Sequence, residues 1–199
     1  MNSKKFHDRN SNILLTAEKI INEKGYFKFR MEDVSDTLQI AKGTLYNHYK
    51  SKELLLFDLV YPKLNNLLYE LININSLPMC FEQKFQNTIE TMIYSQYHQF
   101  LLFSYSDVAT LFQDENQILM VNIQNQLINE FNKLIQSGFE EGKISDEFSE
   151  DFLSHQLLSV LNPLLHSLLV SDSNKMQLDE FIHQTSIILL KGMGVYDEE

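Results

Sequence analysis

The sequence has little cysteine and no long apolar run, and both deficits restrict what the protein can be. Cys80 is the single cysteine among 199 residues, which excludes an internal disulfide and any zinc site built on a cysteine pair. We therefore expect a reducing, intracellular setting. The longest apolar stretch, 152–170, is interrupted by two histidines, an asparagine and a proline, so it is a poor match to the ~20 apolar residues of a membrane span. The first ten residues are polar and lack the apolar core of a signal peptide. We predict a cytoplasmic protein with no membrane partner.

Sequence patterns of the common enzyme classes are also missing. The chain contains no phosphate loop, no G-x-G-x-x-G, no G-x-S-x-G and no H-E-x-x-H. Cys80 lacks a neighbouring histidine in the sequence. Asp151, His155 and His166 fall on one helix face, but such a stripe is more typical of an exposed or interface surface than of a metal site. We predict no enzymatic activity, no catalytic residue, no cofactor and no metal.

Charge is distributed unevenly along the chain. The formal net charge is −11, which by itself argues against a nucleic-acid partner. Residues 1–52, however, hold eight lysines, two arginines and six acidic residues, for a net charge of +4, whereas residues 53–199 carry −15. Phosphate binding depends on a local basic patch rather than on the whole-chain sum. A small basic module is therefore joined to a large acidic one.

Apolar residues recur at spacings of three and four along nearly the whole chain, and hairpin signals are absent. The pattern predicts an all-α protein of about nine helices. Gly25 is expected to end the first helix, Ser51 and Ser149 to cap later ones, and Asp114 to form a capping box with Gln117. The expected helices cover approximately 12–24, 31–38, 42–49, 52–71 with a kink at Pro62, 78–103, 114–138, 150–169 and 175–191, with a brief segment at 107–112.

The short segment 42–49 has an anchoring side and a presenting side. At about 100° per residue, Leu45 and Tyr49 share one side. The other side and its flanks carry a glycine, hydrogen-bonding groups and a cation: Lys42, Gly43, Thr44, Tyr46, Asn47 and His48. Such groups suit a phosphate backbone and the base edges of a major groove. An ordinary helical turn whose polar face meets water has the same periodicity, so periodicity alone leaves both interpretations open.

Residues 12–60 resemble the tetracycline-repressor (TetR) family of bacterial transcriptional regulators. The resemblance rests on Glu-Lys-Gly-Tyr at 23–26, the pair Asp33-Val34, and above all IAKGTLYNHYKSKELLL at 40–56. It implies a helix-turn-helix DNA-binding domain over 1–52, with the start of a linking helix at 52–71, and a larger ligand-binding and dimerisation domain over 53–199. The implied function is a repressor that binds a palindromic operator in double-stranded DNA as a homodimer. A small lipophilic effector would release it.

The resemblance also assigns individual residues to the DNA contact. Asn47 is the best candidate for reading sequence, because an amide can bond an adenine edge bidentately. Arg30 would contact the backbone, and Gly43 would keep the helix close to the duplex. The full set of expected DNA-binding residues is Arg30, Lys42, Gly43, Thr44, Tyr46, Asn47, His48 and Lys52.

Three positions depart from the family pattern. Phe29-Arg30 stands where a Thr or Ser cap is usual, Gln39 where a turn glycine is usual, and Ala41 where a serine caps the recognition helix. A missing cap costs ~1 kcal/mol. These departures, with the acidic body, are the support for an alternative function: a helical dimer that mainly binds a protein or lipid partner and keeps a vestigial DNA-binding module.

The C-terminal two-thirds are rich in aromatic residues at helical spacing, which indicates a core more often than a pocket. The polar groups among them could instead orient a ligand in an apolar cavity. The residues proposed for ligand binding are Tyr61, Met92, Tyr94, Gln96, Tyr97, Phe100, Phe103, Phe112 and Gln124. By resemblance to the family, the last two helices form the dimer interface, with the residues Leu157, Leu158, Leu161, Leu165, Leu168, Ile188 and Leu189.

Overall fold

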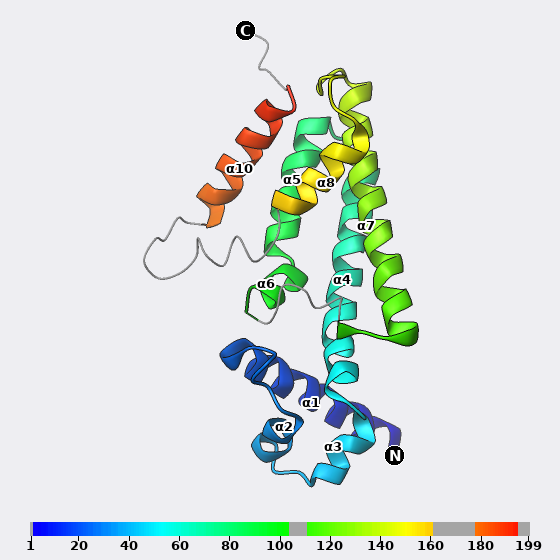
Figure 1. The fold of residues 1–199 in the computed structure, drawn as a ribbon, viewed down its shortest axis with the longest axis vertical. Coiled ribbons are helices and arrows are strands. Elements are labelled where there is room, and N and C mark those ends of the chain that lie inside the picture. Colours follow the sequence, from blue (N-terminus) through cyan, green and yellow to red (C-terminus); the bar gives the residue numbers. More distant parts are fainter. Residues whose placement is uncertain (1, 104–110, 161–177, 195–199) are drawn as a thin grey trace.

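The computed structural model describes residues 2–103, 111–160 and 178–194. Within these ranges the regular elements are all helices. This confirms the all-α prediction, and Figure 1 shows a small N-terminal group of helices below a larger helical body. The helices are α1 (Asn2–Lys24), α2 (Met31–Thr37), α3 (Lys42–His48), α4 (Lys52–Ser76), α5 (Phe81–Tyr94), α6 (Gln96–Phe103), α7 (Asp114–Glu140), α8 (Glu150–Val160) and α10 (Leu178–Gly192).

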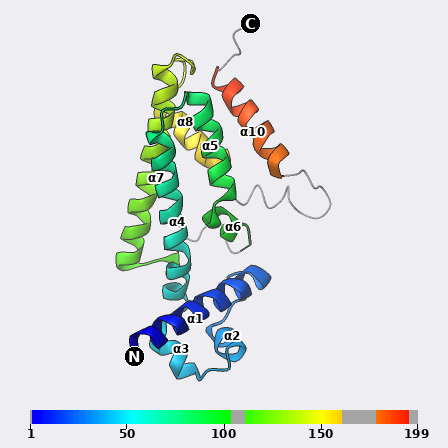
Figure 2. The ribbon, with the colours of Figure 1, turned by 180° about the vertical axis from the view of Figure 1, so that it is seen from behind.

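The N-terminal group consists of α1, α2 and α3, joined to the body by the start of α4 (Figure 2). Helix α1 begins ten residues before the predicted start at 12. Its first turns were not predicted because they lack an apolar stripe, yet the Phe6 ring stacks on His48 of α3 with centroids 4.1 Å apart. The extra turns thus pack against the end of α3. Gly25 follows α1 with a φ of 78°, as its predicted role at the helix end requires.

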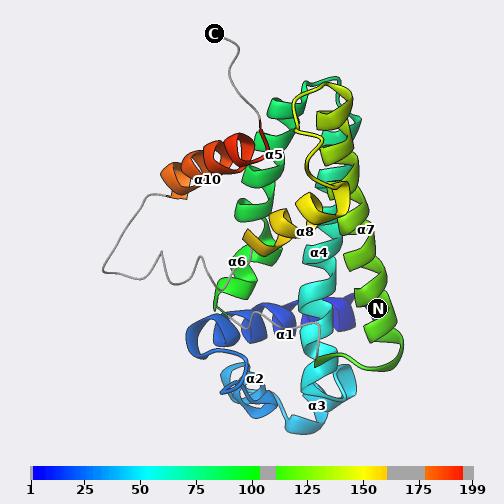
Figure 3. The same ribbon diagram turned by 45° about the horizontal axis from the view of Figure 1, so that its top comes forward.

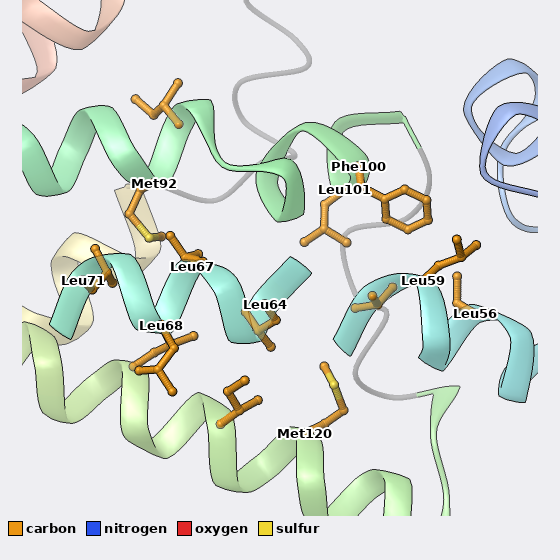
Figure 4. Packing of buried hydrophobic residues seen from close by; sticks show 14 of the residues in the cluster. Leu56, Leu59, Leu64, Leu67, Leu68, Leu71, Met92, Phe100, Leu101 and Met120 are labelled. Atoms are coloured by element: carbon orange, nitrogen blue, oxygen red, sulfur yellow. The ribbon is translucent and has the colours of Figure 1, made fainter. Parts of the chain in front are cut away.

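Helix α4 runs from the N-terminal group through the centre of the body. Ser51 caps it as predicted, because its Oγ accepts a hydrogen bond from the Leu54 N–H at 3.3 Å. The helix continues through Pro62 to Ser76, beyond the predicted end at 71. Its apolar side chains pack between α5, α6 and α7, and Figure 4 shows Leu64, Leu67 and Leu68 among residues of these neighbours. The helix that leaves the N-terminal group is therefore also the core of the C-terminal body.

One predicted helix and one predicted cap are wrong. The predicted helix 78–103 is divided at Ser95, whose hydroxyl donates to the Met92 carbonyl at 2.8 Å and accepts from the His98 N–H at 3.0 Å. One serine therefore ends α5 and caps α6. Helix α7 has Gln113 rather than Asp114 as its N-cap residue, and no side-chain capping bond forms there.

The remaining helices complete the body. Helix α7 lies along α4, α8 packs against α7, and α10 lies beside α5 (Figure 3). Ser149 caps α8 as predicted, with its Oγ accepting from the Phe152 N–H at 3.3 Å. No helix in the described ranges is both long and apolar enough to cross a membrane.

Candidate nucleic-acid interface

The turn between α2 and α3 has a defined hydrogen-bonded geometry. The N–H of Gln39 donates to the Asp36 carbonyl at 3.2 Å, and the N–H of Ile40 donates to the Ser35 carbonyl at 3.0 Å. This bond pair is the Schellman arrangement, which places a left-handed residue just past the helix end. Gln39 occupies that position with a φ of 52°. The sequence has Gln39 where a turn glycine is usual, and the positive φ of this residue strains the backbone by roughly 1 kcal/mol.

We expect Gln39→Gly to stabilise the protein. Glycine adopts positive φ without a steric penalty but costs about 0.4–1 kcal/mol more to order from the unfolded chain, so the net gain should be at most about 0.6 kcal/mol. Urea unfolding followed by circular dichroism measures it. Asp36→Gly is the matched control, because Asp36 is exposed within α2 and glycine there should destabilise the helix. A loss of stability with both variants would show that the Gln39 side chain contributes more than its backbone strain costs.

The anchoring side of α3 is buried as predicted. Leu45 is fully buried and Tyr49, which follows the helix, is 4% exposed. Both belong to the same apolar core as Val34 of α2. The apolar core therefore anchors α3 through this side.

The presenting side of α3 faces outward. Lys42, Gly43 and Asn47 are exposed, Tyr46 is 37% exposed, and Thr44 is half-buried. The Lys42 ammonium lies 3.6 Å from Glu32 in an exposed ion pair, which contributes little to stability and is easily exchanged for a phosphate. Ala41, the N-cap residue, provides no side-chain bond. The structure thus brings five of the predicted DNA-binding residues together on one accessible face.

His48 is held differently from these five residues. Its ring is half-buried against Phe6, and its Nδ1 lies 3.2 Å from Asn10 Oδ1. Burial, and secondarily the nearby charge of Arg9, lowers the pKa of His48. Phe6 and Asn10 could not be predicted as neighbours of His48, because they lie about forty positions from it and leave no local signal in the sequence.

Lys52 is held within the chain, unlike the exposed members of the predicted DNA-binding set. Its ammonium donates to the Tyr26 carbonyl at 2.6 Å and lies 3.9 Å from the centroid of the Tyr26 ring. Burial lowers the pKa of Lys52. In the free protein the side chain therefore joins α4 to the turn after α1.

Arg30 stands at the N-cap of α2 and is exposed. Its guanidinium cannot accept a capping bond. Asp33 compensates, because its carboxylate accepts from the Arg30 N–H at 2.7 Å and also binds the Lys24 ammonium. The Lys24 hydrogen bond holds the pKa of Asp33 below its usual value.

We expect Asp33→Asn to reduce stability by about 0.5–1 kcal/mol at pH 7, the range of a partly exposed ion pair. Because the folded-state pKa is depressed, this stabilisation is present above the ordinary aspartate pKa of about 3.9 and is lost as pH falls through the folded pKa. Urea unfolding at pH 7 and in steps below pH 4 should show the two proteins converging. Asp36→Asn removes the same charge from the same helix and is the control. A difference between wild type and Asp33→Asn that stays constant with pH would refute this account.

The residues predicted to bind a ligand are separated by the fold. Met92, Phe100 and Phe112 are buried, and Tyr61 stacks on Phe57 with centroids 5.0 Å apart. Burial raises the pKa of Tyr97 to about 12. Gln124 is half-buried on α7, and the side chain of Phe103 lies outside the described part of the chain. The buried members pack along α4: Figure 4 shows Met92 beside Leu67, and the Phe112 ring packs edge-on against Phe57 with centroids 5.4 Å apart.

Tyr94 and Gln96 lie apart from the buried members of the predicted ligand-binding set. Tyr94 is 51% exposed, and its hydroxyl donates to Asp179 of α10; Gln96 is also exposed. Both line an open surface hollow of about 440 Å³ together with Glu70 and Glu90. They are too polar and too accessible to belong to an apolar cavity.

Several polar groups of the body were not predicted. A second hollow of about 530 Å³ lies along α4, α7 and α8, and its lining includes Asn132 and Glu130. Glu130 is only 6% exposed, and its carboxylate is held by Lys133 at 2.6 Å and by Asn75 at 2.9 Å. His98 is 2% exposed. No group of metal-binding side chains occurs among the described residues.

The predicted dimer residues also need correction. Leu157 is 1% exposed, so it packs in the chain's own core. Ile188 is 69% exposed, whereas Leu158 and Leu189 are half-buried. Leu161, Leu165 and Leu168 lie outside the described residues. Phe152 and Ile187, at 51% and 38% exposure, are apolar surface that the sequence analysis did not select.

Comparison with known proteins agrees with this arrangement. Residues 13–59 match the family model described as bacterial regulatory proteins, tetR family. A comparison with curated protein sequences finds no significant match. The ketosteroid transcriptional regulator KstR2 of Mycobacterium tuberculosis is 19% identical, with a TM-score of 0.77 over 96% of both chains.

Two further solved structures with this fold contain ligands. The transcriptional regulator FadR from Bacillus subtilis, in complex with stearoyl-CoA, is 16% identical, with a TM-score of 0.69 over 92% of this chain and 98% of that one. AibR, in complex with isovaleryl coenzyme A and operator DNA, is 16% identical, with a TM-score of 0.72 over 94% of this chain and all of that one. Residues 13–59 thus match the tetR-family model, and the chain as a whole shares the fold of solved tetR-family regulators.

Proposed function

We propose that the protein is a repressor that binds a palindromic operator as a homodimer and leaves it when a lipophilic effector binds. In this proposal residues 1–52 bind DNA, and residues 53–199 bind the effector and form the dimer. The observation that carries it is the division of α3 into a fully buried side and an exposed side of hydrogen-bonding groups. A helix anchored in this way presents side chains to a major groove without losing its own support.

Helix α4, which joins the N-terminal helices to the body, supports control of DNA binding by a ligand. Helix α4 begins against the DNA-binding helices and continues into the core of the body. Any change in the packing around its buried leucines would therefore tilt the helix that positions the DNA-binding domain. In a dimer, such a change would alter the separation of the recognition helices, which must match grooves ~34–36 Å apart.

A fluorescence-anisotropy titration tests DNA binding. A labelled palindromic duplex from the region upstream of the protein's own gene is the probe, and affinity should fall steeply as salt rises. Lys42→Ala should weaken binding to all sequences, whereas Asn47→Ala should relax preference at particular bases. Lys191→Ala, an exposed lysine on α10, is the charge-matched control and should change little. Affinity that does not depend on salt would overturn the proposal.

The effector class can be tested on the same complex. Acyl-CoA thioesters are the first compounds to try, because two proteins with this fold were solved with one bound. Stearoyl-CoA and stearate should be compared, since the apolar chain is common to both and only the thioester carries the nucleotide. Release by both would indicate that the buried apolar region recognises the chain. Release by neither would remove long acyl compounds as effectors.

A further inference from the structure

Four side chains form a continuous hydrogen-bonded series from α4 to the end of α3. Asp58 Oδ2 lies 3.0 Å from the Tyr49 hydroxyl, which lies 3.0 Å from Asn10 Nδ2. Asn10 Oδ1 in turn lies 3.2 Å from His48 Nδ1. Three helical elements thus meet through polar atoms beside the DNA-facing surface. Leu45 already anchors α3, so the series calls for a separate explanation.

The direction of every bond in this series follows from its first member. The Asp58 carboxylate can only accept, and the Tyr49 hydroxyl has one proton, so that proton is directed to Asp58. Burial first, with a further contribution from Asp58, raises the pKa of Tyr49 to about 12, which keeps the hydroxyl protonated at neutral pH. The Tyr49 oxygen must then accept from Asn10, which fixes the amide with Nδ2 toward Tyr49. Asn10 Oδ1 therefore faces His48 as an acceptor.

The proton on His48 is thereby assigned. A carbonyl oxygen at Nδ1 requires that Nδ1 carry the hydrogen, and in the neutral ring Nε2 then has a lone pair. The stacked Phe6 ring, inclined by only 19°, fixes the plane of the imidazole. Burial and the Arg9 charge favour the neutral form.

We infer that Asn10, oriented by Tyr49 and Asp58, is a positioning residue that holds the His48 proton on Nδ1, so that neutral His48 offers Nε2 to DNA as a hydrogen-bond acceptor. The part that concerns DNA rests on the proposed function. Phosphate oxygens are acceptors only, so this form of His48 cannot bond a phosphate through Nε2. In the major groove the available donors are the exocyclic amines of adenine and cytosine. His48 therefore selects a base, in contrast to the phosphate role that was open to it from sequence.

Long-range ¹H–¹⁵N NMR of the full-length, ¹⁵N-histidine-labelled protein without DNA tests the proton position at neutral pH. Wild type should show the Nδ1–H tautomer of His48. Asn10→Ala and Tyr49→Phe should both shift it toward the Nε2–H tautomer, and Asn12→Ala, an exposed asparagine on α1, should not. An Nε2–H tautomer in wild type overturns the inference. An unchanged Nδ1–H tautomer in Asn10→Ala refutes the role of Asn10.

Selection from a pool of randomised duplexes tests the consequence for DNA. Wild type should enrich adenine or cytosine at one position of each half-site, and Asn10→Ala should lose about 2- to 10-fold of that preference, the value of one hydrogen bond. Enrichment that is identical for both proteins overturns the recognition role. If wild type selects no sequence at all, the proposed function fails, while the NMR result still decides where the proton lies.

Discussion

Leu45→Ala should lower the free energy of unfolding by about 2–5 kcal/mol while removing no atom that DNA could touch. Leu45 is fully buried and is the only residue within α3 that is buried. Truncating it leaves a cavity under a helix of seven residues, which is too short to persist without its packing. The α3 amides should exchange hydrogen faster, and affinity for a duplex should fall at least tenfold at temperatures where the body remains folded. Urea unfolding, hydrogen exchange and anisotropy measure the three effects.

Leu54→Ala provides the control for Leu45→Ala. Leu54 lies in the first turn of α4, is 41% exposed and loses the same atoms on substitution. Its effect should stay within about 0.5 kcal/mol, as for other surface positions. Full DNA affinity in Leu45→Ala would mean that the duplex, and not the apolar core, positions α3. That result would remove the anchoring side as a requirement for function.

The predictable parts of this protein are those set by nearby residues. The bounds of α2 and α3, the Ser51 cap and the strain at Gln39 all follow from spacing or from single positions in the sequence. Each depends on interactions within about five residues, where periodicity and capping rules apply. The buried and exposed sides of α3 follow for the same reason.

The features that could not be predicted depend on distant contacts or on one residue with two partners. The sequence gives no sign that the Lys52 ammonium donates to the Tyr26 carbonyl, 26 positions away, at 2.6 Å. Ser95 bonds both to the helix before it and to the helix after it, and helical periodicity continues across that break. Asn10 gains its role from side chains nearly forty positions away. Tertiary contacts of this kind leave no pattern in the sequence.

Gly43 gives the strongest physical indication that α3 has a partner outside the chain. A Cβ added at this position would meet no heavy atom within 4 Å, and the glycine is not in a left-handed conformation. Nothing in the protein itself therefore requires glycine there. A glycine inside a helix nevertheless costs up to about 1 kcal/mol relative to alanine. A partner that approaches the backbone of α3 closely would account for a glycine as the second residue of this helix.

Gly43→Ala should therefore have opposite effects on folding and on DNA binding. The free energy of unfolding should rise by up to about 1 kcal/mol. The gain is smaller than at the middle of a helix because Gly43 lies in the first helical turn. DNA affinity should fall about 5- to 150-fold, the equivalent of the 1–3 kcal/mol that an added methyl costs in a well-packed contact. Thermal unfolding and anisotropy on the same preparations measure both quantities.

A matched substitution separates a contact with DNA from a general effect of the added methyl. Gly192 ends α10, also has open space around its Cβ position and lies in the body far along the chain from α3. Gly192→Ala should leave DNA affinity unchanged. Equal affinity of Gly43→Ala and wild type would show that the exposed side of α3 stands away from the duplex, and the presenting side would then lose its assigned role. A fall in affinity together with a gain in stability has no source within the folded protein, because the free chain leaves that space empty; the methyl group must then meet the DNA.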